Sequence, residues 1–346
     1  RAWRQWLFSF YVQDDIKATK SLTLNLGLRY EPVAVMTETH GRVQNLRDLL
    51  RDAEMTLGDP MYRNPSLRNV ALRFGFSWDP LGRGKTAIRG GFGLFFDPYL
   101  SHQTSPAHIS SAPFAFVGPI RNPAFPRHPL PTSFPNSSQE VLIGAFNAEN
   151  PYSMQYTLNV QRELSPDLLL MIGYAGSRGV NLIRGGNVNI PIPQIVNGRK
   201  FFPEGAPRRN PNWGDIDLKR GDGNSWYNAL LLSAQKRFSR GSQFQVAYTF
   251  SRTIDEGSGI IAADLTTSVT DPQDPDDRKN DRGLAAFHVK HNLVFNYTFD
   301  LPFRRQQAGL AEKIFGGWQV NGITAIRSGM PFTVGVRADR ARALFR

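Results

Sequence analysis

The chain has 346 residues, with 41 Lys and Arg against 29 Asp and Glu, a net charge of +12 and a pI near 10.1. It contains no cysteine, which excludes disulfides and thiolate metal sites, and no stretch approaches the roughly 18 apolar residues of a transmembrane helix. The basic residues are spread singly and no nucleic-acid-binding module is recognisable, so we expect solvated arginines and no nucleic-acid partner.

Alternation of apolar and polar residues begins near the N-terminus. A strand is predicted over Leu7–Asp15, and the clearest one follows over Ser21–Glu31. In the second strand the apolar side chains occupy every other position: Leu22, Leu24, Leu26, Leu28 and Tyr30. A period of two places them all on one face of an extended strand, whereas a helix would scatter them.

The same pattern returns eight more times along the chain. The predicted strands are Val70–Asp79, Thr86–Phe96, Ser153–Glu163, Leu168–Gly176, Tyr227–Arg237, Gln243–Arg252, Phe287–Phe299 and Gly317–Arg327. With the first two, this makes ten strands, which predicts an all-β fold.

The links between these strands alternate between short and long. Four of the short links have four to six residues and the last, Asp300–Gly316, has 17. The long links are Pro32–Asn69, Asp97–Tyr152 with its proline-rich stretch Arg121–Pro135, Ser177–Trp226 and Thr253–Ala286, of 38, 56, 50 and 34 residues. Tight turns at one end and long loops at the other are typical of an antiparallel up-and-down transmembrane β-barrel, whereas soluble sandwiches have evenly spaced turns.

Aromatic residues at the predicted strand ends favour the same fold. They are Trp78, Phe238, Phe299 and Trp318 at the short-turn end, and Tyr30, Phe96, Tyr174 and Phe250 at the long-loop end. Membrane barrels carry such girdles at both interfaces. We therefore expect Leu24 and Leu26 to face lipid, with Asn25 and Arg29 facing a wet lumen.

Ten strands leave two unpaired edges, which a sheet in lipid does not tolerate. We therefore expect an incomplete barrel whose other strands lie outside this chain. The chain does not begin with Met and its first strand follows at once, so we interpret residues 1–346 as a fragment forming part of one barrel domain.

Several of these segments, in this order, resemble the Oar-like TonB-dependent receptors of outer membranes. The segments include FYVQDDIKATKSLTLNLGLRYEP (Phe10–Pro32), LRFGFSWDPLGRGKTAIRGGFGLFFD (Leu72–Asp97), NPYSMQYTLNVQRELSPDLLLMIGYAGSRG (Asn150–Gly179) and GGWQVNGITAIRSGMPFTV (Gly316–Val334). The resemblance implies a 22-stranded barrel in a Gram-negative outer membrane, with a plug and an N-terminal domain that this chain does not show. It also implies import of a substrate with energy from the inner-membrane TonB complex.

No catalytic site, cofactor site or metal site is predicted. Gly84-Lys85-Thr86 resembles the end of a phosphate-binding loop, but it lies in a strand turn with no helix behind it. His288 and His291 would point to opposite faces of a strand, so they cannot chelate together. The five aspartates of Asp271–Asp281 could hold Ca²⁺, but we favour a solvated loop neutralised by Arg278, Lys279 and Arg282.

If substrate binds the long loops, aromatic and arginine side chains are the expected contacts. We expect Trp213, Trp226, Arg208 and Arg209 in this role. Aromatic rings suit a carbohydrate or a peptide, and arginines suit a carboxylate or a phosphate. A passive porin-like channel and a soluble β-rich binding or adhesion module remain alternatives.

Overall fold

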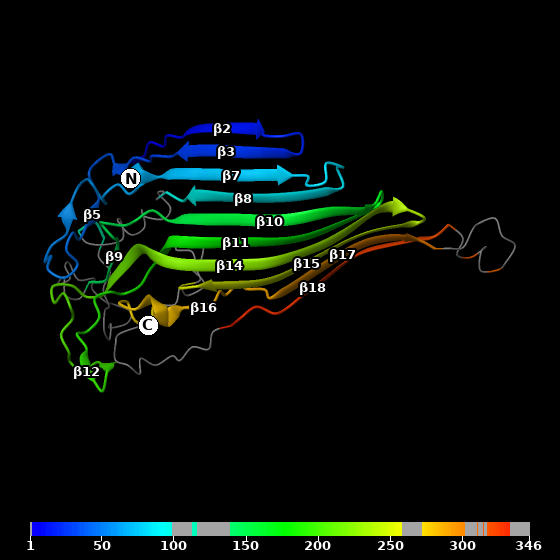
Figure 1. The fold of residues 1–346 in the computed structure, drawn as a ribbon. Coiled ribbons are helices and arrows are strands. Elements are labelled where there is room, and N and C mark those ends of the chain that lie inside the picture. Colours follow the sequence, from blue (N-terminus) through cyan, green and yellow to red (C-terminus); the bar gives the residue numbers. More distant parts are fainter. Residues whose placement is uncertain are drawn as a thin grey trace.

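The computed structural model describes residues 2–98, 113–115, 139–257, 272–301, 310, 314 and 317–332. Its main feature is a twelve-stranded sheet in which ten strands follow one another as a meander, each antiparallel to the next (Figure 1). These are β2 (Phe10–Lys17), β3 (Leu22–Tyr30), β7 (Val70–Trp78), β8 (Thr86–Phe96), β10 (Tyr152–Ser165), β11 (Leu168–Arg184), β14 (Ile216–Ser239), β15 (Ser242–Asp255), β17 (His291–Asp300) and β18 (Gln319–Arg327). The predicted all-β, antiparallel, up-and-down fold is confirmed. Among the described residues the sheet does not close, because β2 and β18 each have a neighbour on one side only.

Two strands are much longer than predicted. β11 continues to Arg184 and β14 begins at Ile216, so the third long link is 185–215, rather than Ser177–Trp226. The extensions pair with each other as far as Arg184 and Arg220. The sequence does not reveal these extensions because glycine, charged and polar residues dominate them, and Ile216 and Leu218 at the start of β14 give only a short alternation with polar residues. The prediction for β17 was also too long, since this strand begins at His291 and leaves His288 in the preceding turn.

A two-residue turn joins β14 to β15 through Arg240 and Gly241. Their φ angles of 50° and 74° place both residues in the left-handed region, as a two-residue hairpin turn of type I′ requires. The Lys236 ammonium donates to the carbonyl and the hydroxyl oxygens of both Ser239 and Ser242 and so ties the strand ends together. This turn fixes the register of β14 against β15.

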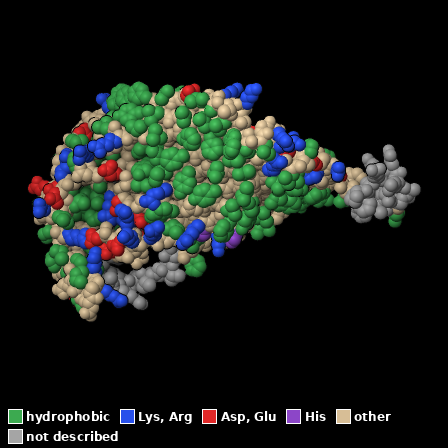
Figure 2. Space-filling model, viewed as in Figure 1, with side chains coloured by type: hydrophobic (Ala, Val, Ile, Leu, Met, Phe, Trp, Pro, Cys, Tyr) green, Lys and Arg blue, Asp and Glu red, His purple; other side chains and the backbone are tan. Residues whose placement is uncertain are grey.

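The register sorts the side chains of the meander onto two faces. Leu158, Ile172, Leu230 and Phe250 lie on one face of four neighbouring strands, because Leu158 pairs with Tyr174, Ile172 with Leu232, and Leu230 with both Tyr174 and Phe250. All are exposed, and Figure 2 shows hydrophobic side chains gathered over the middle of the sheet. We call this the outward face.

The other face, which we call the inward face, is polar. Arg89 donates to Gln161 across 2.7 Å, and Asn25 donates to Asp15 across 2.6 Å. Asn159 lies between Arg89 and Gly173 on this face. The predicted assignment of the odd and even positions of the strands to an apolar and a polar face is therefore confirmed by the pairing.

Glycines on the outward face lie beneath aromatic rings. A Cβ added at Gly176 would lie 2.1 Å from the Tyr156 ring, and one at Gly90 would lie 2.4 Å from the Phe76 ring. Each ring covers the backbone of the adjacent strand, which is how large side chains compensate for the missing side chain of a strand glycine. The glycine-rich sequence of β8 is therefore compatible with a continuous apolar surface.

The long links carry short elements of their own. They are β1 (Trp3–Arg4), β4 (Thr37–Glu38), β5 (Gln44–Asn45), β6 (Thr56–Leu57), η1 (Ser66–Arg68), β9 (Val141–Gly144), β12 (Gln194–Val196), β13 (Arg199–Phe201), η3 (Arg278–Asp281) and β16 (Gly283–Leu284). Within the described ranges, no helix has the length and apolar character needed to cross a membrane. The stretch 121–135 and most of the link 300–316 lie outside the described residues.

Candidate functional site

The four long links come together at one end of the sheet, on the left of Figure 1. We call their described parts, 31–69, 139–151, 185–215 and 272–290, the cap. The sequence predicts long loops here, and the structure shows that their described parts form a packed body with its own apolar clusters. The cap is the part of the molecule in which side chains from distant segments meet.

The largest cluster combines three of the four links. Leu46 comes from the first, Val141 and Ile143 from the second, and Trp213 from the third, and β14 adds Ile216 and Leu218. Trp213 is 1% exposed and its indole N–H donates to the Asp52 carbonyl oxygen across 2.9 Å. Burial of this ring against three links makes them one unit.

Backbone and amide hydrogen bonds join the same links. β9 pairs in parallel with the start of β14, from Val141 with Ile216 to Gly144 with Lys219. The buried Asn210 side chain donates to the Leu49 and Asp52 carbonyl oxygens, across about 160 residues of sequence. Because the buried Asn210 amide has both partners in the first link, it holds the third link against the first.

Ion pairs join the third link to the fourth. Both guanidinium nitrogens of Arg209 reach the Asp276 carboxylate, at 2.9 and 2.6 Å, and the Lys200 ammonium lies 2.8 Å from it. The hydrogen bonds from Arg209, followed by those from Lys200, lower the pKa of Asp276 from 3.8 to about 2. Lys200 also pairs with Asp274 at 2.7 Å.

The acidic stretch 271–281 is therefore neutralised in a different way from the one predicted. Its partners are Lys200 and Arg209, together with Arg184 of β11, which lies 3.4 Å from Asp281. The predicted Arg278 instead pairs with Glu256 at 3.2 Å, and Arg282 lies over the Trp226 ring. The sequence could not reveal this because the partners lie more than 60 positions away. Within the described residues there is no group of three or more metal-ligating side chains that could hold an ion.

The four residues expected to contact substrate have different environments. Arg208 pairs with Asp215 at 2.7 Å and donates to the Asn189 carbonyl oxygen at 2.8 Å, and Arg209 holds Asp276. Trp213 is enclosed in the cluster described above. Their role in binding stays a prediction, but Arg208 and Arg209 are adjacent and partly exposed, whereas Trp213 supports the cap from within.

Trp226, the fourth, lies in β14 and not in a loop. Its ring lies on the outward face, in register with Arg178 and Ile254. The Arg178 guanidinium lies 4.8 Å and the Arg282 guanidinium 4.0 Å from the ring centroid. The ring is therefore covered by two cations, on the face opposite to the polar inward one.

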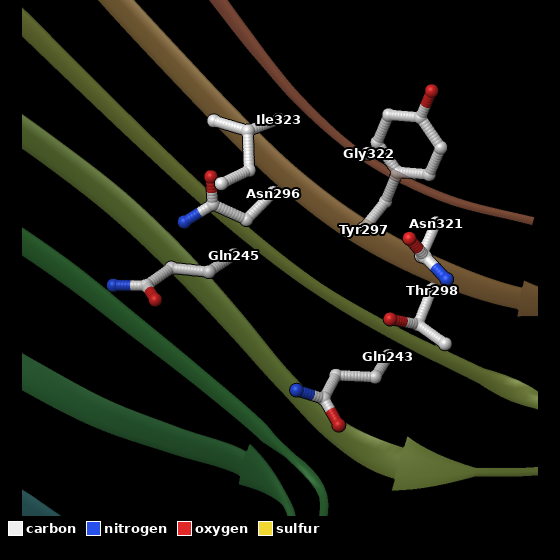
Figure 3. Close-up of a pocket in the computed structure, with 8 residues that line it drawn as sticks. All are labelled: Gln243, Gln245, Asn296, Tyr297, Thr298, Asn321, Gly322 and Ile323. Atoms are coloured by element: carbon white, nitrogen blue, oxygen red, sulfur yellow. The ribbon is translucent and has the colours of Figure 1, made fainter.

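A second polar surface lies on the inward face, near the short-turn end. Figure 3 shows Gln243, Thr298 and Asn321 in one row across three strands, with Gln245 and Asn296 in the next. All are neutral hydrogen-bonding groups, so the surface suits an uncharged polar partner. The sequence indicates these positions through the alternation of glutamine and asparagine with aromatic residues.

Comparison with known proteins gives one family. The model of the outer membrane beta barrel domain matches residues 1–344. No functionally curated protein sequence matches the chain.

Solved structures with a similar fold are outer-membrane transporters and receptors. The outer membrane transporter YddB from Escherichia coli is 12% identical over 85% of this chain and 31% of its own, with a TM-score of 0.48. The siderophore receptor PirA from Pseudomonas aeruginosa is 12% identical over 87% and 38%, with a TM-score of 0.42. The FrpB iron transporter from Neisseria meningitidis is 10% identical over 86% and 31%, also with a TM-score of 0.42. The chain thus spans about a third of the length of these proteins.

Proposed function

Because this chain belongs to the outer membrane beta barrel domain family and lies in the outer membrane of a Gram-negative bacterium, we propose that it is part of the barrel of an Oar-like TonB-dependent receptor. In this proposal residues 1–346 contribute ten strands to a barrel of 22. A plug and an N-terminal domain lie elsewhere in the protein, and the TonB complex acts through the plug.

The observation that carries this proposal is the cap. Its links are joined by a shared apolar cluster, by β9 pairing with β14 and by the ion pairs of Asp276. A rigid body at one end of a barrel restricts free diffusion and offers a preorganised binding surface, as selective uptake requires. A barrel with an open mouth would instead favour passive diffusion through a channel.

We propose that substrate is recognised on the exposed surface of the cap, with Arg208 and Arg209 near it. Both arginines already have carboxylate partners, Asp215 and Asp276, at 2.7 and 2.6 Å. Their net charge is therefore largely compensated, which favours an uncharged or weakly charged substrate such as a carbohydrate or a peptide over a polyanion.

Planar-bilayer conductance in KCl tests the proposal against the passive-channel alternative. The full-length protein, purified from outer membranes, is compared with a form that lacks the region preceding Arg1. We expect the full-length protein to conduct little and the shortened form to open large, stable channels, because removal of a plug empties the lumen. Steady conductance of the full-length protein would contradict energised import and support the porin-like alternative.

A further inference from the structure

Basic side chains gather on the outward face just beyond the apolar belt, at the margin nearest the cap (Figure 2). The four described residues are Arg178 of β11, Arg252 of β15, Arg282, which directly precedes β16, and Lys290, which directly precedes β17. We call them the basic patch. Their positions follow from the register, because Arg178 pairs with Trp226, and Arg252 with Asn228, on the same face as Leu230 and Phe250.

The height of the basic patch can be stated relative to a row of exposed apolar residues in the belt. Leu230, Tyr174 and Phe250 form this row, and all three are exposed. Arg252 lies two residues beyond Phe250 on β15, and Arg178 lies four residues beyond Tyr174 on β11. At about 3.4 Å per residue, the charges lie roughly 7 to 14 Å above the aromatic row, at the depth of lipid headgroups.

None of these four cations has a carboxylate partner among the described residues, although several carboxylates lie in the neighbouring links. Arg184, Arg208, Arg209 and Arg278 each pair with an Asp or Glu at 2.6 to 3.2 Å. By contrast, Arg178 contacts the Trp226 ring and donates one hydrogen bond to Asn224 Oδ1 at 3.3 Å. Arg282 contacts the same ring, and Lys290 lies 5.9 Å from the Phe250 ring. A ring contact orients a cation and leaves most of its N–H donors available.

We propose that the basic patch binds phosphate-bearing lipid headgroups of the leaflet on the cap side of the membrane. Charge complementarity identifies the occupant, since four cations without a carboxylate partner in the described ranges, next to an apolar belt, match a headgroup phosphate whose acyl chains contact that belt. Tyr174 and Phe250 lie between the two regions and contact the glycerol or sugar level of the lipid. The inference rests on the outward position of these residues and does not depend on energised import.

The test measures lipid binding to the full-length protein in a neutral detergent, with the tryptophan fluorescence change as readout. The two probes are bisphosphorylated lipid A and the same lipid A after enzymatic removal of both phosphates. We expect the phosphorylated lipid to bind at least tenfold more tightly, and this preference to fall as salt rises from 50 to 500 mM, because screening weakens exposed charge interactions.

Two charge-matched variants localise the effect. The first carries Arg178→Gln, Arg252→Gln, Arg282→Gln and Lys290→Gln, and we expect it to lose the phosphate preference. The control carries Lys20→Gln, Arg83→Gln, Lys85→Gln and Arg237→Gln, which removes the same charge from exposed positions at the short-turn end. We expect the control to retain the preference. Heat-modifiable migration on gels confirms that each barrel is folded.

Two results of the direct binding measurements would overturn the proposal. One is equal binding of both lipids by the unchanged protein, and the other is an equal loss of preference in both variants. Competition by millimolar inorganic phosphate as effective as that by the lipid would likewise overturn it, because the patch would then be a free-phosphate site. If the fourfold variant does not fold, the double variant Arg252→Gln/Lys290→Gln gives the same reading, since neither side chain makes a hydrogen bond among the described residues.

Discussion

At the scale of single residues, chemically similar side chains have different roles because of where the chain places them. Trp213 and Trp226 are 13 positions apart in the sequence. The first is 1% exposed and donates to the Asp52 carbonyl oxygen, whereas the second lies between two guanidinium groups on the outward face. The arginines differ in the same way, since Arg208 and Arg209 pair with carboxylates whereas Arg178 and Arg282 contact the Trp226 ring.

Asp276 gives a prediction at this scale. Asp276→Asn removes the negative charge that pairs with Arg209 and Lys200. We therefore expect the backbone amides of 272–284 to exchange about fivefold faster at pH 7. This factor corresponds to a loss of ~1 kcal/mol in the free energy of local opening, as suits a partly exposed ion pair. The Asp276 carboxyl has a lowered pKa in the folded state. Its contribution is therefore complete above pH 4 and is lost as the pH falls from about 4 to about 2.

Hydrogen exchange followed by mass spectrometry at several pH values checks both statements. The matched control is Glu54→Gln, an exposed acid in the first link of the cap. Unchanged exchange in Asp276→Asn, or an equal effect of Glu54→Gln, would show that the ion pair does not hold the fourth link.

At the scale of elements, strand length depends on pairing as much as on pattern. β8 has the predicted bounds because its partners on both sides are apolar on the same face. β11 and β14 continue beyond the apolar belt because they pair with each other, and β9 then adds a parallel partner to β14. These extensions separate the cap from the apolar belt. They also place Trp226 and Arg178 at the margin of the belt.

The β14–β15 turn gives a prediction at the element scale. Gly241→Ala forces a side chain into a φ of 74°, and its Cβ would lie 3.3 Å from the Asp300 Cβ, so we expect a loss of about 1 to 2 kcal/mol in the free energy of unfolding. Arg240→Asn should stabilise the turn by roughly 0.5 kcal/mol, because asparagine tolerates the left-handed region better.

Urea unfolding of the full-length protein in lipid vesicles measures both changes. Gly283→Ala is the matched control, since its backbone is not left-handed and nothing lies within 4 Å of the added Cβ. A neutral result for Gly241→Ala would mean that the turn does not have the conformation described.

At the scale of the whole molecule, the side chains on each face of the sheet indicate which solvent that face contacts. The outward face is a continuous apolar belt, and the inward face carries Arg89, Gln161 and the amides of Figure 3. A wall with lipid on one side and water on the other explains why so many large apolar side chains are exposed on a chain with a net charge of +12.

Neighbouring positions on β10 test this arrangement. Since the chain has no cysteine, Leu158→Cys and Thr157→Cys each introduce a single thiol, on the outward and the inward face respectively. In outer-membrane vesicles, a charged membrane-impermeant maleimide should react with Thr157→Cys at least tenfold faster, because lipid excludes the reagent from the other face. The EPR spectrum of a spin label attached to Leu158→Cys should be broadened by oxygen. Equal reaction rates at both positions would contradict a lipid-facing belt.

The sequence by itself determined the meander. Ten alternating segments, their short and long links and the assignment of each side chain to one of two faces follow from local pattern, because a strand has a period of two and each pairs with its neighbour in sequence. Only the tertiary structure decided the cap, in which Trp213, Asn210 and Asp276 find partners 60 to 160 positions away. The physical reason is that contacts between distant loops depend on how the strands bring their ends together in space, and no local period encodes that. The basic patch is likewise decided by the tertiary structure. The sequence does not show which basic side chains lack a carboxylate partner, because that depends on which carboxylates the fold brings near them.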